Sequence, residues 1–225
     1  MARSEDIEIQ REVAAALNNL SSVDENKVEI ADRSISTIIT LSLSGDTEVE
    51  KQAVCAIANL VEMVELHEKL LEEHGLAPLI ALAIADDIGT KGESCRALAN
   101  LAANRDMQSA IMGQGGLRPL IAALSVNDKT CQRFGSLGIG NLATNIANQV
   151  KIVQEGAVHP LVALVGDTHK DSEARRYATL AIANLASTVG NHPALIEEGS
   201  LHAMFSLSNS PDVQSQYYVA YSLAK

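Results

Sequence analysis

IANLAS, residues 182–187, is the stretch that decides the fold, because closely similar phrases recur along the whole chain. They read LNNLSS at 17–22, IANLVE at 57–62, LANLAA at 98–103 and GNLATN at 140–145. The asparagines of the five phrases are separated by 40, 41, 41 and 43 residues. A fixed period of this length is the sequence signature of stacked structural repeats.

A second phrase keeps the same period. It reads HGLAPLIAL from His74, GGLRPLIAAL from Gly115 and EGAVHPLVAL from Glu155, and its prolines are 41 residues apart twice. Because two unrelated landmarks share one period, we interpret the chain as a repeat array with a unit of about 41 residues.

Apolar and small residues return every three or four positions within a period, which predicts helices and no strands. In the fourth period we expect a short helix over about 147–154 that ends at a glycine, and a second over about 157–166 with its proline in the first turn. A third and longest helix, over about 170–187, carries the Asn-Leu phrase near its end. Acids placed to cap third helices are Asp46, Asp128 and Asp171.

The ends of the chain are less regular than its middle. The sequence begins inside a third helix, over about 5–21, and stops inside another, so six third helices and five pairs of first and second helices are expected. Thr37 and Ala203 stand where the prolines would be in the first and last pairs. We expect one solenoid domain over 1–225, part of a longer repeat array.

The two phrases, G-[AL]-x-x-P-L-[IV]-x-L and A-x-x-A-[IL]-x-N-L-A, resemble the armadillo repeat over essentially all of residues 5–224. The resemblance implies an all-α, right-handed superhelical solenoid of about five three-helix armadillo repeats with partial terminal repeats. It also implies that the third helices line a concave groove that binds extended peptides. HEAT repeats are the structural alternative, but they have two helices and lack the phrase. The end of the chain resembles vacuolar and armadillo-repeat-only scaffold proteins.

One face of the third helices carries the candidate site. Residues four and eight before each asparagine share its face, because two steps of four drift only slowly around a helix. The candidate groove residues are Asn19, Asn59, Asn100, Asn141, Asn184, Lys51, Arg96, Arg133 and Arg176. Amide side chains donate and accept at once, so they suit an extended backbone, and arginines suit carboxylates or phosphates. The pattern predicts a partner segment that is acidic or phosphorylated.

Two other interpretations of this face remain open. The cations, including Arg11 in the row eight before the asparagines, could pair instead with Glu12, Glu93 or Glu173 nearby. The asparagines could tie down neighbouring helix ends. Nuclear-import adaptors of the importin-α type carry a Trp four residues before the asparagine. This chain has no Trp, which argues against recognition of basic signals.

Motifs for catalysis or metal binding do not emerge. His67 and His74 are seven residues apart without an H-E-x-x-H pattern, and we interpret their helix as a surface helix. The glycines of GSLGIGN, residues 135–141, suit close helix packing rather than nucleotide binding, and Cys55 is interpreted as a small groove residue. We predict a non-enzymatic adaptor without cofactor or metal. A regulatory or targeting module of a larger enzyme is the alternative.

Composition limits the partners. A formal net charge of −11 and an aromatic content of 3% argue against nucleic-acid binding, and no apolar stretch is long enough to insert in a membrane. Three cysteines without C-x-x-C spacing fit a reducing compartment, so we expect the cytoplasm, or the nucleus. Self-association through the terminal repeats is expected if their apolar faces lack neighbours, and these faces contain Val13, Leu17, Val219 and Leu223.

Overall fold

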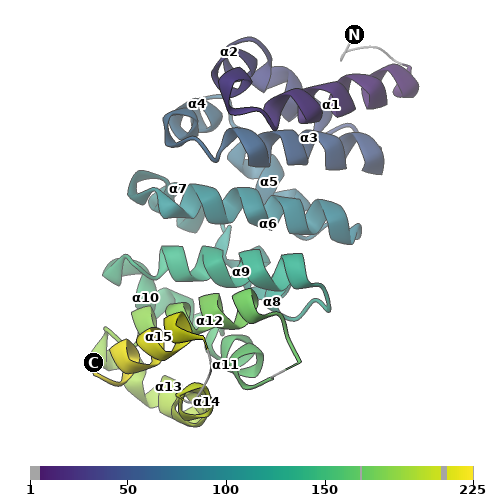
Figure 1. The fold of residues 1–225 in the computed structure, drawn as a ribbon. Helices are drawn as coiled ribbons and strands as arrows, with labels where there is room; N and C mark the ends of the chain where they lie inside the picture. Colours follow the sequence, from purple (N-terminus) through teal and green to yellow (C-terminus); the bar gives the residue numbers. More distant parts are fainter. Residues whose placement is uncertain (1–5, 168, 209–211, 225) are drawn as a thin grey trace. The chain divides into compact units, whose positions relative to one another are not determined.

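The computed structural model describes residues 6–167, 169–208 and 212–224, and within these ranges every regular element is a helix (Figure 1). The all-α prediction is confirmed. The chain divides into two compact units, Met1–Gly116 and Leu117–Lys225, each built from the same kind of repeat.

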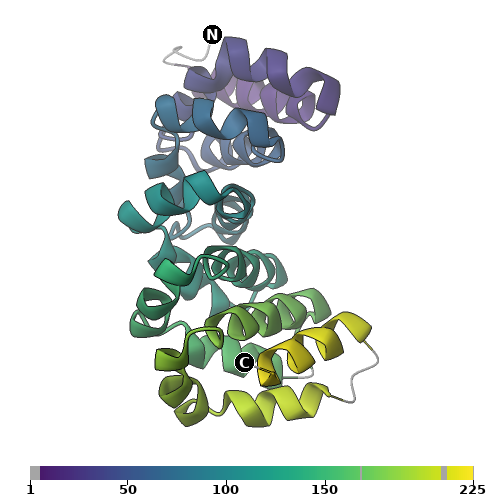
Figure 2. The same ribbon diagram turned by 90° about the vertical axis from the view of Figure 1, so that its left-hand side faces the viewer.

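The first unit contains three long helices that correspond to the predicted third helices, α1, α3 and α6. The helix α3 packs against both α1 and α6 (Figures 1 and 2). Behind them lie the 18-residue α2 and a set of shorter helices. The bounds in this unit are α1 (Ile7–Ser21), α2 (Asp24–Leu41), α3 (Thr47–Leu60), η1 (Val64–Leu66), α4 (His67–Glu72), α5 (Leu76–Leu82), α6 (Ile88–Ala103) and α7 (Arg105–Gly113).

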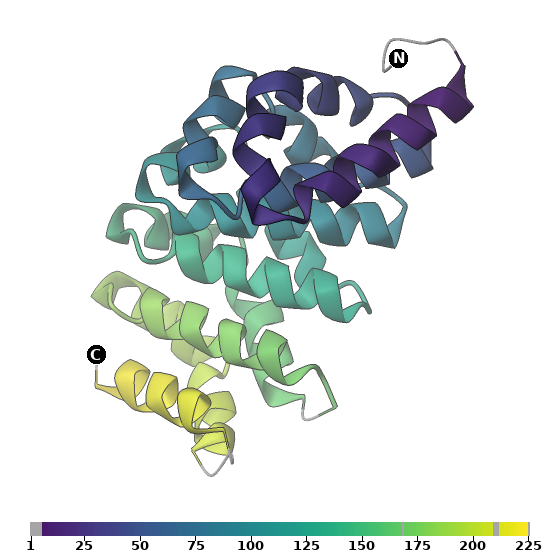
Figure 3. The same cartoon turned by 45° about the horizontal axis from the view of Figure 1, so that its top comes forward.

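The second unit repeats this arrangement, with α9, α12 and α15 as its third helices. The helix α12 packs against both α9 and α15 (Figure 3). The bounds are α8 (Leu117–Leu124), α9 (Lys129–Leu142), α10 (Ile146–Gln154), α11 (Val158–Gly166), α12 (Ser172–Leu185), η2 (Val189–Asn191), α13 (His192–Glu197), α14 (Ser200–Leu207) and α15 (Val213–Leu223). The predicted helices over 147–154, 157–166 and 170–187 therefore exist, with ends within two residues of the prediction.

Aspartates begin the third helices. The side chains of Asp46, Asp128 and Asp171 each accept a hydrogen bond from the backbone N–H three residues on, so these predicted caps are confirmed. Asp87 and Asp212 cap two further third helices in the same way, and Asp6 caps α1 by accepting from the N–H of Glu8, two residues on. An acid at this place also interacts favourably with the helix dipole.

A single backbone position decides whether the short helices form a pair. Gly115, Gly156 and Gly199 have φ values of 85°, 84° and 80°, in the left-handed region that breaks a helix at little strain in glycine. His74 occupies the same position with φ of 60°. Arg33 stands there in the first repeat, where the helix continues without a break as α2, 18 residues long.

The expectation of five first and second helix pairs is therefore wrong for the first repeat. Besides lacking a glycine at the junction, that repeat has Thr37 where three later repeats have proline. Threonine keeps the backbone N–H that proline lacks, so the helical hydrogen bonds run on through this position.

The leucines of the Asn-Leu phrase lie in the core of each unit. Leu60, Leu101, Leu142 and Leu185 are at most 2% exposed. Glycine allows close packing at one place in the second unit, where a Cβ on Gly135 would approach the carbonyl oxygen of Leu120 to 2.9 Å. The interpretation of the GSLGIGN glycines as packing residues is confirmed.

Candidate functional site: the third-helix faces

The repeated asparagines keep one position on the third helices but differ in their surroundings. Asn19 is exposed, whereas Asn59, Asn100, Asn141 and Asn184 are half-buried. Half-burial leaves an amide accessible to a ligand while its neighbours hold it in place. We call the surfaces around these residues the Asn faces, on α1, α3 and α6 in the first unit and on α9 and α12 in the second.

Asn59 is fully engaged by neighbouring third helices. Its Nδ2 donates to Asn18 Oδ1 and to Ser21 Oγ on α1, both at 3.2 Å, and its Oδ1 accepts from Arg96 Nη2 on α6 at 2.9 Å. Arg96 also pairs with Glu62 at 2.9 Å. The amide thus joins three successive third helices of the first unit.

The other amides are less occupied. Asn184 Nδ2 donates to the backbone oxygen of Gly140 at 3.0 Å, which joins α12 to α9. The side chains of Asn19 and Asn100 make no hydrogen bond to the described residues, so both amides can donate and accept toward a ligand. Asn141 has a partner of its own within the chain.

Cations of the row eight before the asparagines face the capping aspartate of the next third helix. Arg11 donates to both oxygens of Asp46, at 3.2 and 2.8 Å. Arg133 donates to both oxygens of Asp171, at 3.3 and 3.1 Å. Forked pairs of this kind hold neighbouring repeats in register.

The other two cations of this row, Lys51 and Arg176, interact more weakly with the capping aspartates Asp87 and Asp212. The pKa of Asp87 is lowered first by hydrogen bonds from Thr90 and further by the nearby charge of Lys51. The pKa of Asp212 is lowered first by the hydroxyl of Ser215 and further by the charge of Arg176. Each cation of this row in the described chain therefore lies near a capping acid, and the row is interrupted only at Gly92, which has no side chain.

The electrostatics of the forked pairs differ between the units. The pKa of Asp46 falls to about 2, chiefly because Arg11 and the backbone N–H of Val49 donate to it. Burial raises the pKa of Asp171, but the hydrogen bond from Arg133 and the backbone N–H of Ala174 outweigh it, so the net change is a lowering.

Most of the basic side chains on the Asn faces form ion pairs with acidic residues of the chain itself. Arg96 pairs with Glu93 at 2.7 Å, and Arg133 and Arg176 both reach Glu173, at 2.7 and 3.2 Å. Two of the three acids named as alternative partners are thus partners, while Arg11 pairs with Glu8 rather than Glu12. Glu62, which the sequence did not single out, joins Arg96 to the buried Lys27 at 2.7 Å.

The half-buried Cys55 lies four residues before Asn59. Burial, and next the charge of Glu93, raise the pKa of its thiol to about 11. It is therefore a neutral side chain at ordinary pH, consistent with a small groove residue.

A second repeated set of polar residues escaped the sequence reasoning. At the start of each first helix a side chain bonds the backbone oxygen six residues earlier, where the preceding third helix ends: His67 to Val61, Gln108 to Ala102, Gln149 to Ala143 and His192 to Ala186. These positions are 41, 41 and 43 residues apart, a signal that was present in the sequence. The helix that begins at His67 lies at the surface, as interpreted, since Glu68 and Glu72 are exposed, but the side chain of His67 faces inward and is 2% exposed.

The terminal third helices leave part of their apolar faces uncovered. Val13 and Leu17 are half-buried, and Leu223 is 43% exposed. Val219, expected to be poorly covered as well, is buried. No helix in the described ranges is long and apolar enough to cross a membrane, and the same residues contain no cluster of three His, Cys, Asp or Glu suited to a metal ion.

Comparisons with known proteins agree with the repeat architecture. The family model "Armadillo/beta-catenin-like repeat" matches residues 145–187. A crystal structure of an engineered protein is 29% identical, with a TM-score of 0.91, over 99% of this chain and 92% of that chain. A designed armadillo repeat protein in complex with the peptide (KR)4 is 28% identical, with a TM-score of 0.89, over 99% of this chain and 95% of that chain.

A further structure, of computationally designed armadillo repeat proteins for modular peptide recognition, is 27% identical, with a TM-score of 0.92, over 99% of this chain and 95% of that chain. No curated protein matches the chain. The repeat model and the matching folds together support the armadillo repeat family, and the chain has the fold of an armadillo repeat solenoid. This fold supports a role as a protein-binding scaffold.

Proposed function

We propose that the chain is a non-catalytic scaffold or adaptor that holds an extended segment of a partner protein along its Asn faces. The observation that carries the proposal is the half-buried amide of Asn100, which lies on the Asn face of the first unit and has no hydrogen-bond partner among the described residues. An unused amide in a fixed position can donate to and accept from one peptide unit of an extended chain. The similarity to designed peptide-binding repeat proteins supports the same role.

The charges beside the amides suggest an acidic or mixed-charge segment. Arg176 uses one nitrogen to reach Glu173 and lies over the ring of Tyr177, 5.4 Å from its centroid, which leaves part of its guanidinium for a carboxylate or phosphate. Lys51 makes no direct ion pair in the described chain. Arg133 is committed to Asp171 and Glu173, so we expect it to contribute little.

A basic segment is the second candidate. Glu62, Glu93 and Glu173 lie on the same faces, 46%, 25% and 38% exposed in their side chains, and could receive lysines or arginines. A structural neighbour is in complex with a Lys-Arg peptide. The absence of Trp argues against an importin-like site, so this candidate ranks second.

A peptide array tests the proposal. Extended peptides of acidic, mixed and basic charge are screened against the full chain, and hits are measured in solution at several salt concentrations. We expect Asn100→Ala to weaken every extended ligand with little change in thermal midpoint, and Arg176→Gln to weaken only ligands with an acid, in a salt-dependent way. Leu43→Ala, at a 62% exposed position, is the matched control. Full affinity in Asn100→Ala would contradict the proposal.

The wider setting is also a proposal. We place the chain in the cytoplasm or nucleus because its three cysteines are free thiols, two of them buried. We keep the proposal of one continuous solenoid domain, and of protein partners rather than nucleic acid. If the chain is instead a targeting module of a larger enzyme, the same Asn faces would bind its target.

A further inference from the structure

The guanidinium of Arg96 lies on the Asn face of the first unit, and each of its three nitrogens is bonded to the chain. Nε donates to Glu93 Oε2 at 2.7 Å, Nη1 to Glu62 Oε1 at 2.9 Å and Nη2 to Asn59 Oδ1 at 2.9 Å. Carboxylates and an amide oxygen arranged around one planar cation are the groups that bind arginine side chains in protein complexes. We call Glu62, Glu93 and Asn59 the arginine cradle, and the chain fills this cradle with a residue of its own.

The cradle departs from the repeat at two positions that meet in space. Four residues before the asparagine, or at the corresponding place of the last third helix, the chain carries Ala15, Cys55, Arg96, Leu137, Leu180 and Tyr218. Three residues after the asparagine, it carries Ser22, Glu62, Ala103, Thr144 and Ser187. The single cation of the first row stands one repeat after the single acid of the second row, and the two form an ion pair. Because the other repeats stack without this pair, the repeat architecture does not require it.

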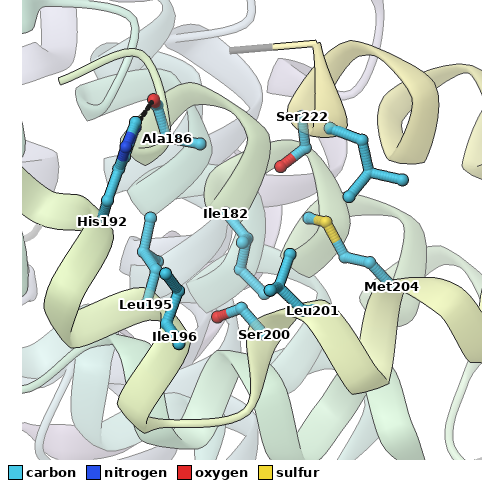
Figure 4. A pocket seen from close by; sticks show the side chains of 10 residues that line it. Ile182, Ala186, His192, Leu195, Ile196, Ser200, Leu201, Met204 and Ser222 are labelled. Atoms are coloured by element: carbon cyan, nitrogen blue, oxygen red, sulfur yellow. Dashed lines mark hydrogen bonds between the residues drawn. The ribbon is translucent and has the colours of Figure 1, made fainter. Parts of the chain in front are cut away.

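A buried lysine holds one wall of the cradle in place. Lys27 is 2% exposed and donates to Glu62 Oε2 at 2.7 Å, so the two oxygens of this carboxylate are divided between Lys27 and Arg96. Lys27 occupies the position at which other first helices bond the end of the preceding third helix, as His192 does by bonding Ala186 O at 2.9 Å (Figure 4). In the first repeat this position fixes Glu62 instead. One acid of the cradle is therefore held independently of Arg96.

We propose that Arg96 is an internal ligand that determines the charge preference of the Asn face in the first unit, an inference that rests on the proposed binding of extended segments. Glu62, Glu93 and Asn59 Oδ1 are all bonded to Arg96, so an arginine of a basic segment must first displace it. A tethered group competes with a free one at a high effective concentration, which makes this exchange unfavourable. Arg96 also stands one helical turn before the unused amide of Asn100, where its positive charge favours an acidic residue.

The cradle can be tested without a peptide, by removing Arg96 and supplying its head group in solution. Arg96→Ala is a suitable variant because Ala15 occupies the same position in α1. The thermal midpoint of the full chain is measured against the concentration of ethylguanidinium, with ethylammonium as the control for charge and ionic strength. We expect Arg96→Ala to lower the midpoint and ethylguanidinium to restore at least half of the loss in a saturable way. Ethylammonium lacks the planar fork and should restore much less, and Arg96→Ala combined with Glu93→Gln should lose the restoration.

Peptide binding to the full chain tests the charge preference. The probes are a Lys-Arg octapeptide and a Glu-Ser octapeptide, each measured at two salt concentrations. Arg96→Leu places in α6 the residue type that α9 and α12 carry at this position. This variant should bind the Lys-Arg peptide at least tenfold more tightly than the unaltered chain does, and the Glu-Ser peptide several-fold more weakly. Arg96→Lys keeps the charge and should retain the original preference.

A matched control separates the cradle from the net charge of the chain. Arg33→Leu removes the same charge from a 76% exposed side chain on α2, so it should alter neither affinity. A gain for the Lys-Arg peptide in Arg33→Leu equal to that in Arg96→Leu would overturn Arg96 as the determinant, and so would an unchanged preference in Arg96→Leu.

The two parts of the test separate this inference from the proposed function. Failure of ethylguanidinium to restore the midpoint of Arg96→Ala, or restoration that persists after Glu93→Gln, would overturn the cradle whatever the peptides do. Absence of saturable binding of both peptides to all of these chains would instead overturn the proposed function, and the charge preference with it. The two failures are therefore distinguishable.

Discussion

Asn59 and Asn184 occupy one position of the repeat, but neighbouring side chains occupy the whole amide of Asn59 and leave the amide of Asn184 partly open. Each amide donates to the residue just before the asparagine position on the preceding third helix, and that residue is Asn18 for one and Gly140 for the other. Arg96 then covers the oxygen of Asn59, whereas Tyr218, which stands at the position of Arg96 relative to Asn184, makes no such bond in the described chain. The repeat fixes where the amide lies, and its neighbours fix how much of it a ligand can use.

The largest effect should fall where the two units are alike. Leu60 and Leu185 are 1% and 0% exposed, so truncation of either to Ala should reduce the free energy of unfolding by about 2–5 kcal/mol. Leu20 holds the same place in the first phrase but is 51% exposed. Leu20→Ala should change stability by less than about 0.5 kcal/mol. Chemical denaturation measures all three, and an equal loss in Leu20→Ala would contradict the burial argument.

The asparagines themselves should separate the units. Asn59→Ala removes two donor contacts and leaves a nitrogen of Arg96 unpaired, so we expect a loss of about 1–3 kcal/mol. Asn184→Ala removes one bond to Gly140 O and should reduce stability by about 0.5–1.5 kcal/mol. Denaturant midpoints compare the two variants. Equal losses of stability in the two variants would mean that the additional hydrogen bonds of Asn59 contribute no more than the single hydrogen bond of Asn184.

The helices could be predicted from the sequence because their signals act locally. An aspartate cap, a glycine at the helix break and an apolar spacing each lie within a few residues of the structure they specify, as at Asp46, Asp128 and Gly156. The continuous α2 was missed although Arg33 already marked the absent glycine. The prediction of a helix pair in this repeat rested on the repeat period alone, and it did not consider which residue breaks the helix within each repeat.

The site was harder to predict because its partners lie one repeat away. Whether Arg133 is available to a ligand depends on its bond to Asp171, 38 residues later. Both residues were identified from the sequence, but nothing in the sequence indicated that they pair. The residues that bond the ends of the third helices were missed for another reason. His67 and Gln108 make the same hydrogen bond with different side chains, so no repeated residue type marks their position. Which of the candidate groove residues bind a ligand stays a prediction.

Acid should test the two forked ion pairs against each other. The pKa of Asp46 is lowered from 3.8 to about 2, so its contribution to stability is present above pH 3.8 and is lost as the pH falls through about 2. Carboxyl shifts followed by NMR should show Arg11→Met raising this pKa toward its ordinary value. Arg133→Met should likewise raise the pKa of Asp171, because burial is then opposed only by backbone N–H groups such as that of Ala174. An unchanged titration of Asp46 in Arg11→Met would rule out the pair as the cause.

The last comparison concerns Cys55, which stands four residues before Asn59 where the second unit has Leu180 before Asn184. Burial raises the pKa of the thiol from 9.0 to about 11, so at pH 8 the reactive thiolate should be about a hundredfold rarer than in an unperturbed cysteine. A chain with Cys95→Ala and Cys131→Ala isolates this thiol, and its alkylation rate is compared before and after unfolding. Since the charge of Glu93 adds to the rise, Glu93→Gln should speed alkylation modestly, while Glu29→Gln, a substitution on α2, should not. A native rate equal to the unfolded rate would show that the surroundings of Cys55 and Asn59 open in solution, and the contrast with Asn184 would then be lost.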